Sequence, residues 1–145
     1  MILQLVPEHG YVILVLIGTV FTLLYLGAKV GGARRKANVA YPNMYATAEE
    51  AEKDKMKHLF NCAQRAHQNT LENIPGFLIL LLVSAIEYPV ISAISGAVYL
   101  ASRVAYAGGY CTGDPKKRRR GFFGYFALLA MLGASGATAF KLLTQ

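Results

Sequence analysis

The sequence predicts an all-α integral membrane protein, a bundle of four transmembrane helices. Of its 145 residues, 54% are hydrophobic and 16% are charged, whereas soluble domains carry about a quarter charged residues. The hydrophobic residues also gather in long runs instead of recurring at the spacing of an amphipathic helix. A helix needs about 20 mostly apolar residues to cross a bilayer. We therefore expect a single membrane domain over residues 1–145.

The first helix is expected over about residues 8–35, because an apolar run fills residues 11–28. The residues before this run are not basic and no small-residue cleavage site follows it, so we expect a retained helix and no signal peptide. The second helix is expected over about residues 50–86. Its apolar part begins only at Ile74, but the Glu and Lys residues before it recur at helical spacing and predict an early start outside the bilayer.

The third and fourth helices are expected over about residues 90–112 and 119–144. A tight turn at residues 87–89 precedes the third helix, because Pro89 disfavours a helical residue before it. A short connection, CTGDPKKRRRG, separates the two helices and is strongly basic.

The distribution of basic residues predicts the orientation. Seven of the fifteen Lys and Arg residues lie in the polar connection at residues 29–60, which includes the ends of the first two helices, and five lie at residues 116–120, in the connection before the last apolar run. Connections rich in Lys and Arg face the cytosol, so we expect lumenal termini in the endoplasmic reticulum or another endomembrane. The net charge of +7 is thereby explained by topology, and we expect no nucleic-acid partner. Two cysteines without metal-ligand spacing predict neither a disulfide framework nor a metal site.

Polar residues line one face of the second helix before its apolar run. They recur at i, i+4, i+7, i+8 and i+11: Asn61, Arg65, Gln68, Asn69 and Glu72. Charged residues at membrane depth usually face a bundle interior or a water-filled cavity. One interpretation is an ion network that only stabilises the structure. The other is a ligand site at the cytosolic end of the helix.

A second polar face lies on the third helix, where Tyr99, Arg103, Tyr106 and Tyr110 recur at i, i+4, i+7 and i+11. Tyrosines at this level are often an aromatic belt, but a belt does not need an arginine among them. Guanidinium groups suit carboxylates, and the lone Glu72 suits an ammonium group. A ligand with two carboxylates and one amine matches this set, and cytosolic glutathione is such a molecule. A nearby arginine would favour its thiolate, which is scarce at pH 7.

Four segments carry a family resemblance: ARRK at 33–36, VAYPNMYA at 39–46, RAHQNTLENIP at 65–75 and GGYCTGDPKKRRRG at 108–121. Together they resemble the MAPEG family of membrane proteins, with the type 3 microsomal glutathione S-transferases as the most similar branch. The resemblance implies a four-helix protein that assembles as a homotrimer and holds glutathione between subunits near the cytosolic face. It also implies that Glu72 holds the glutamyl amine, while Arg65 and Asn69 hold polar ends of the peptide. The full set of implied glutathione-binding residues is Arg34, Arg65, Asn69, Glu72, Arg103, Tyr106 and Tyr110.

The resemblance further implies a thiolate-stabilising arginine just before the fourth helix. Alignment from Gly121 selects Arg118, and alignment from Tyr110 selects Lys117. We expect Arg118, because a guanidinium fork stays charged and pre-organised, with Arg35 as a second catalytic residue.

The expected activity is that of a membrane-bound glutathione transferase and glutathione-dependent peroxidase in lipid metabolism and detoxification. Glutathione would be the cosubstrate, the membrane would supply lipophilic electrophiles and lipid hydroperoxides, and no metal would be needed. Two alternatives stay open: leukotriene-C synthesis, and a non-catalytic partner that presents lipid to a lipoxygenase. A channel would need polar residues along a whole span, and here they stop at the cytosolic ends.

Overall fold

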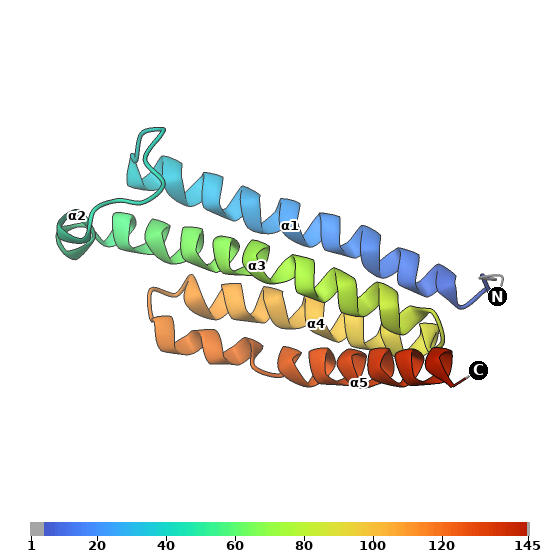
Figure 1. The fold of residues 1–145 in the computed structure, drawn as a ribbon. Helices are drawn as coiled ribbons and strands as arrows, with labels where there is room; N and C mark the ends of the chain where they lie inside the picture. The colour runs from blue at the N-terminus through green and yellow to red at the C-terminus, as the bar shows by residue number, and fades with distance from the viewer. Residues whose placement is uncertain (1–4, 145) are drawn as a thin grey trace.

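Four long helices run side by side in the computed structural model, which describes residues 5–144 (Figure 1). A short helix and a 3₁₀ helix complete the described chain. In order the elements are α1 (His9–Ala37), α2 (Ala48–Lys53), α3 (Lys55–Ala85), α4 (Pro89–Tyr110), η1 (Pro115–Gly121) and α5 (Gly124–Leu143). The chain termini lie at one end of the bundle, and α2 and η1 lie at the other. We call the latter the basic end, because twelve of the fifteen Lys and Arg residues belong to its two connections and their flanks.

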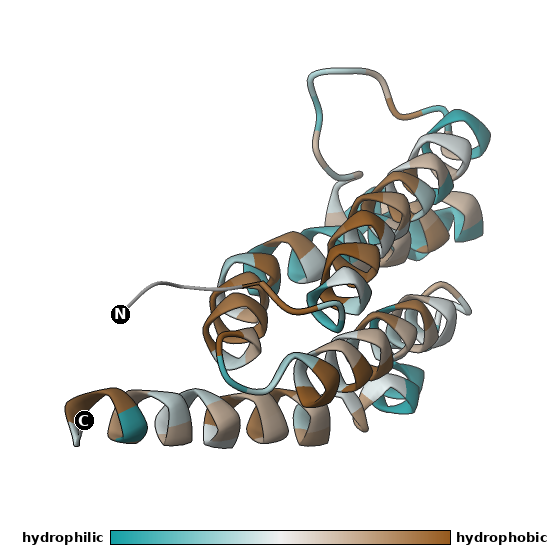
Figure 2. Ribbon diagram, turned by 90° about the vertical axis from the view of Figure 1, so that its right-hand side faces the viewer, coloured by the Kyte–Doolittle hydropathy of each residue, from teal (hydrophilic) through white to brown (hydrophobic). Residues whose placement is uncertain are grey.

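Among the described residues, three of the four long helices have the character of membrane spans. By length and composition, α1, α4 and α5 could each cross a bilayer, and hydrophobic residues recur along the helices in Figure 2. Many large apolar side chains point outward, among them Phe21, Leu24, Phe126 and Leu129. Such a surface suits hydrocarbon, not water. The predicted all-α, four-helix membrane bundle is confirmed.

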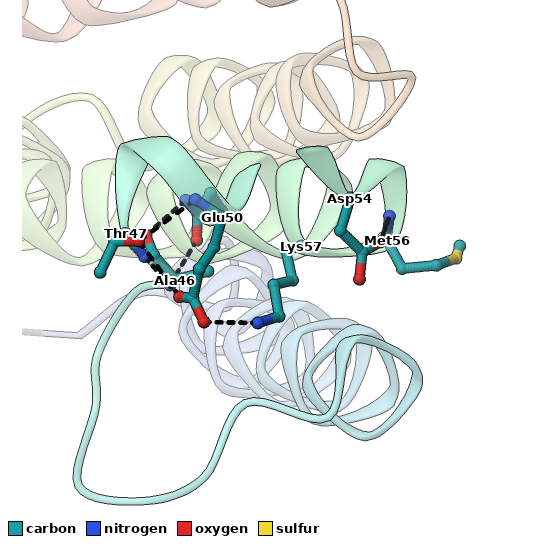
Figure 3. A network of polar contacts seen from close by, with 7 residues as sticks. Ala46, Thr47, Glu50, Asp54, Met56 and Lys57 are labelled. Carbon is teal, nitrogen blue, oxygen red and sulfur yellow. Dashed lines mark hydrogen bonds and ion pairs between the residues drawn. The ribbon is translucent and has the colours of Figure 1, made fainter. Parts of the chain in front are cut away.

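The expected second helix, 50–86, is divided in the structure. Asp54 is extended and ends α2, and its carboxylate accepts the Met56 N–H at 2.7 Å to cap α3 (Figure 3). Thr47 and Glu50 form a capping box that starts α2. Lys57 donates to Glu50 at 2.5 Å, which lowers the pKa of the Glu50 carboxyl. The early start was therefore predicted, but the break at Asp54 was not.

The expected fourth helix, 119–144, begins later, at Gly124. Residues 115–121 form η1 instead, and the Asp114 carboxylate caps it by accepting the Lys116 N–H at 3.0 Å. Close packing explains this path. A Cβ added at Gly121 would lie 2.5 Å from the Ser102 carbonyl oxygen, and one added at Gly124 would lie 2.0 Å from the Ser102 hydroxyl. The two glycines let the chain press against α4 where η1 ends and α5 begins.

The helices α3 and α4 form the centre of the bundle, since each packs against both α1 and α5. Their apolar contact is anchored by Phe77 and Tyr99, whose rings stack with centroids 4.4 Å apart. At the terminal end, the Lys141 ammonium pairs with Glu87 and ties α5 to the turn between α3 and α4. The α3–α4 pair is thus the rigid platform from which the polar faces project at the basic end.

Candidate functional site

The polar face of α3 carries an ion pair that is open to its surroundings. The Arg65 guanidinium donates to the Glu72 carboxylate at 2.9 Å, and the two side chains are 43% and 47% exposed. An exposed pair of this kind contributes little to stability. Arg65 and Glu72 can therefore separate, and each can pair with a charged group of a ligand instead.

Arg103 joins the two polar faces predicted from the sequence. Its guanidinium donates to the Asn69 side-chain oxygen at 2.7 Å and to the Thr70 hydroxyl at 3.1 Å. Its central guanidinium carbon also lies 4.2 Å from the centroid of the Tyr106 ring, in a cation–π contact. Arg103 is only 8% exposed, so these partners compensate the cost of burying its charge. The contact fixes α4 against α3 and leaves the Asn69 amide nitrogen as the donor available to a ligand.

Three phenols lie around this face. The Tyr106 and Tyr110 rings are tilted against each other with centroids 5.7 Å apart. The Tyr45 hydroxyl donates to the Gln68 side-chain oxygen, and burial raises the pKa of Tyr45, so it stays a neutral donor at pH 7. Sequence patterns did not indicate a role for Tyr45, because only the folded connection between α1 and α2 brings it to α3.

Two residues hold that connection in place. The Asn61 side chain clasps Ala46 by accepting its N–H and donating to its carbonyl, both at 2.9 Å. The buried Arg34 guanidinium donates to the Asn43 carbonyl at 2.6 Å and stacks on the rings of Tyr41 and Phe60. Arg34 therefore stabilises the loop within its own chain.

Neither Arg34 nor its exposed neighbour Arg35 forms a hydrogen bond or ion pair with the polar face of α3 among residues 5–144. A single chain thus does not bring the expected α1 arginines to the other expected site residues. Their assignment to glutathione binding and catalysis remains a prediction.

A hollow of about 280 Å³ adjoins Arg103. Its walls come from α4, η1 and the start of α5: Arg103, Tyr106, Arg118, Arg119, Gly121, Phe122 and Tyr125. Lys117 is not among these residues, and its own backbone carbonyl packs on α4 at Gly109. Of the two residues that the alignments select, Arg118 therefore lines this hollow and Lys117 does not. The hollow also adds Arg119, which the sequence did not single out.

Tyr99 is a further polar group that the sequence assigned to no ligand. It is 2% exposed, and its hydroxyl is the only buried side-chain polar atom without a hydrogen-bond partner in the described chain. It faces a small cavity beside Asn73, Ser102, Arg103 and Tyr125. An unpaired buried hydroxyl is costly, so this cavity is a suitable place for a water molecule or a polar ligand atom.

The place of η1, and with it Arg118, depends on Gly109. A Cβ at this position would lie 2.0 Å from the Lys117 carbonyl oxygen, a backbone atom that cannot rotate away. We expect Gly109→Ala to displace η1 and to destabilise the protein by about 1–3 kcal/mol, as overpacking does. Gly108→Ala is the matched control, because an added Cβ there meets no atom within 4 Å and alanine favours a helix. Thermal unfolding in detergent would measure both variants, and equal melting temperatures would contradict the predicted contact.

The arrangement suits an anionic ligand that also carries an amine. Arg65 and Glu72 share the polar face of α3, and the adjoining hollow is lined by Arg103, Arg118 and Arg119. Guanidinium forks bind carboxylates and stabilise a nearby anion. Within residues 5–144, no group of three or more His, Cys, Asp or Glu side chains could hold a metal ion.

The chain also matches a known protein family. The family model described as the MAPEG family matches residues 12–138, which is most of the chain. The matched range contains all four long helices in whole or in large part and every candidate site residue from Arg34 to Arg118.

Proposed function

This chain belongs to the MAPEG family, whose members are mostly glutathione-dependent membrane enzymes, and we propose that it is a glutathione S-transferase and glutathione-dependent peroxidase. Its acceptors would be lipophilic electrophiles and lipid hydroperoxides, as in the type 3 microsomal branch. The observation that carries the proposal is the convergence of Arg118, Arg103 and Tyr106 on one hollow beside the polar face of α3.

Glutathione would bind by replacing the Arg65–Glu72 ion pair. The Glu72 carboxylate accepts hydrogen bonds from the glutamyl ammonium, and the freed Arg65 guanidinium pairs with a glutathione carboxylate. The Asn69 amide donates to the peptide, and the phenols of Tyr106 and Tyr110 line the pocket. The near-equal exposure of Arg65 and Glu72 supports this exchange, because neither group has to leave a buried site.

Arg118 would stabilise the thiolate of bound glutathione. The free thiol has a pKa of about 8.5 and is only a few per cent ionised at pH 7. A guanidinium beside the sulfur favours the anion. In conjugation, the thiolate forms a carbon–sulfur bond as the leaving group departs with its electron pair. In peroxide reduction, it attacks the terminal oxygen, the O–O bond breaks, and the alkoxide takes a proton. A second glutathione then converts the sulfenic acid to glutathione disulfide and water.

A homotrimer would complete this site. The polar face of α3 is open on one side, and Arg35 is exposed on α1 without a partner on that face. A neighbouring subunit's α1 would cover the ligand and supply Arg35, with Arg34 holding the adjoining loop. The basic end would face the cytosol of an endomembrane, where glutathione is available, and the termini would face the lumen.

Ultraviolet absorbance of the thiolate tests the proposal. Purified, detergent-solubilised protein is mixed with glutathione at neutral pH, with S-methylglutathione as the control that has no thiol to ionise. We expect a rapid absorbance rise with glutathione and none with S-methylglutathione. We also expect the protein to conjugate glutathione to a lipophilic aryl halide and to reduce a fatty-acid hydroperoxide. Folded protein that gives neither the rise nor turnover would contradict the enzyme assignment.

A further inference from the structure

A second hollow, of about 350 Å³, opens at the basic end between α1, α3 and the end of α4. It shares no lining residue with the hollow around Arg118. We call it the α1–α3 hollow and define it by its lining: Lys29, Gly32, Ala33, Lys36, Met56, Leu59, Ala63 and Cys111.

Helix geometry builds the walls of the α1–α3 hollow. Its α1 residues recur at i, i+3, i+4 and i+7 and so share one face, and its α3 residues do the same at i, i+3 and i+7. The α1 face is small at its centre, with Gly32 and Ala33. A Cβ added at Gly32 would meet no atom within 4 Å. The space in front of Gly32 is therefore open, and the exposed Met56 and the half-buried Leu59 form its apolar floor.

The charge of the α1–α3 hollow is positive. Lys29 and Lys36 lie two turns apart on α1, and neither pairs with a carboxylate among residues 5–144. The Lys29 ammonium lies 5.3 Å from the Tyr25 ring centroid, which keeps it beside the helix. Two ammonium groups above an apolar floor suit a molecule with an anionic head and a hydrocarbon chain.

We propose that the α1–α3 hollow binds an anionic phospholipid from the leaflet that borders the basic end. The phosphate contacts Lys29 and Lys36, and an acyl chain lies along Met56, Leu59 and Cys111. The location favours this occupant, because basic pockets between membrane helices at the charged interface attract anionic head groups. The proposal is independent of the glutathione site, because none of its residues belongs to that site.

Cys111 provides the probe. It is half-buried in the α1–α3 hollow, whereas Cys62 is buried elsewhere on α3. A Cys62→Ala background leaves one thiol, whose rate of reaction with an uncharged maleimide is measured in nanodiscs. Phosphatidylcholine alone is compared with phosphatidylcholine that contains phosphatidic acid. Occupancy should slow the reaction, by about tenfold when the free lipid is at ten times its dissociation constant.

Two pairs of variants separate this site from general attraction to an anionic bilayer. We expect Lys29→Gln with Lys36→Gln to abolish the slowing, and Lys53→Gln with Lys55→Gln, which removes the same charge outside the hollow, to retain it. Gly32→Leu fills the hollow and should make the rate insensitive to phosphatidic acid. Gly31→Leu is its control, because Gly31 is equally open but does not line the hollow.

Three results would overturn the proposal. The first is an equal rate with and without phosphatidic acid. The second is slowing that survives the Lys29 and Lys36 substitutions. The third is protection by oleate in phosphatidylcholine but not by phosphatidic acid, which would replace the phospholipid by a fatty-acid carboxylate. Melting temperatures of all variants confirm that they are folded, and turnover with glutathione should stay unchanged in each.

Discussion

Arg118→Ala is expected to lower kcat/KM for glutathione conjugation by about 10²–10³-fold, the usual effect of removing one group that stabilises charge in the transition state. The absorbance rise that reports the glutathione thiolate should be lost in the same variant. The reason is geometric, because Arg118 lines the hollow that it shares with Arg103 and Tyr106. Glutathione should still bind, since the polar face of α3 is untouched.

Neighbouring substitutions make the Arg118 prediction specific. Lys117→Ala removes an adjacent positive charge that does not line the hollow, so its thiolate absorbance should match that of the parent. Arg118→Lys keeps the charge but loses the planar fork, and we expect intermediate activity. If Lys117→Ala were inactive and Arg118→Ala active, the alignment from Tyr110 would be correct. If both were active, Arg119, which lines the same hollow, would be the next residue to replace.

The sequence predicted the fold and the placement of the polar residues on two helix faces, because both rest on periodicity. Apolar runs located the four long helices, and helical spacing placed Arg65, Asn69 and Glu72 on one face of α3. The spacing on α4 likewise placed Arg103 beside Tyr106, and the structure joins the two faces through the Arg103–Asn69 hydrogen bond. These predictions needed only 3.6 residues per turn.

The remaining features depend on contacts between segments distant in sequence. Tyr45 reaches Gln68 only because Asn61 and Arg34 hold the connection between α1 and α2. The packing that places Arg118 comes from Gly109 and Gly121 against η1 and α4, which no periodic pattern reveals. The capping preference of Asp54 was readable in the sequence, but the run of helix-favouring residues around it predicted continuity.

The two α1 arginines, Arg34 and Arg35, do not reach the polar face of α3 in a single chain. The resemblance implied a ligand role for Arg34, yet its guanidinium is buried against Tyr41 and Phe60 and bonded to its own loop. Arg35 points outward at the same level. If the protein is a trimer, Arg35 is the residue that is free to reach a neighbour's ligand. The loop held by Arg34 would then help to position Arg35 against the ligand bound by the neighbouring subunit.

Glu72→Gln is expected to raise the KM for glutathione by about 10–100-fold, because a hydrogen bond to a charged group contributes about 1.5–3 kcal/mol. The value of kcat at saturating glutathione should change little, since the amine lies far from the thiol and binds equally in the ground and transition states. Steady-state kinetics measure both constants. Glu49→Gln is the matched control, because it removes an exposed carboxylate that pairs with Lys53, outside the site.

A substrate analogue turns the Glu72 result into a test of contact. Glutathione without its amino group lacks the ammonium that Glu72 is proposed to hold, so the parent should bind it about as weakly as Glu72→Gln binds glutathione. In the variant, removing the amine should cost little more, because the partner is already gone. If the loss of affinity caused by Glu72→Gln and the loss caused by removing the amine simply add, Glu72 acts through Arg65, with which it forms an ion pair at 2.9 Å. The ion pair would then be an orienting element for the guanidinium, and the ammonium would have to be held by another group.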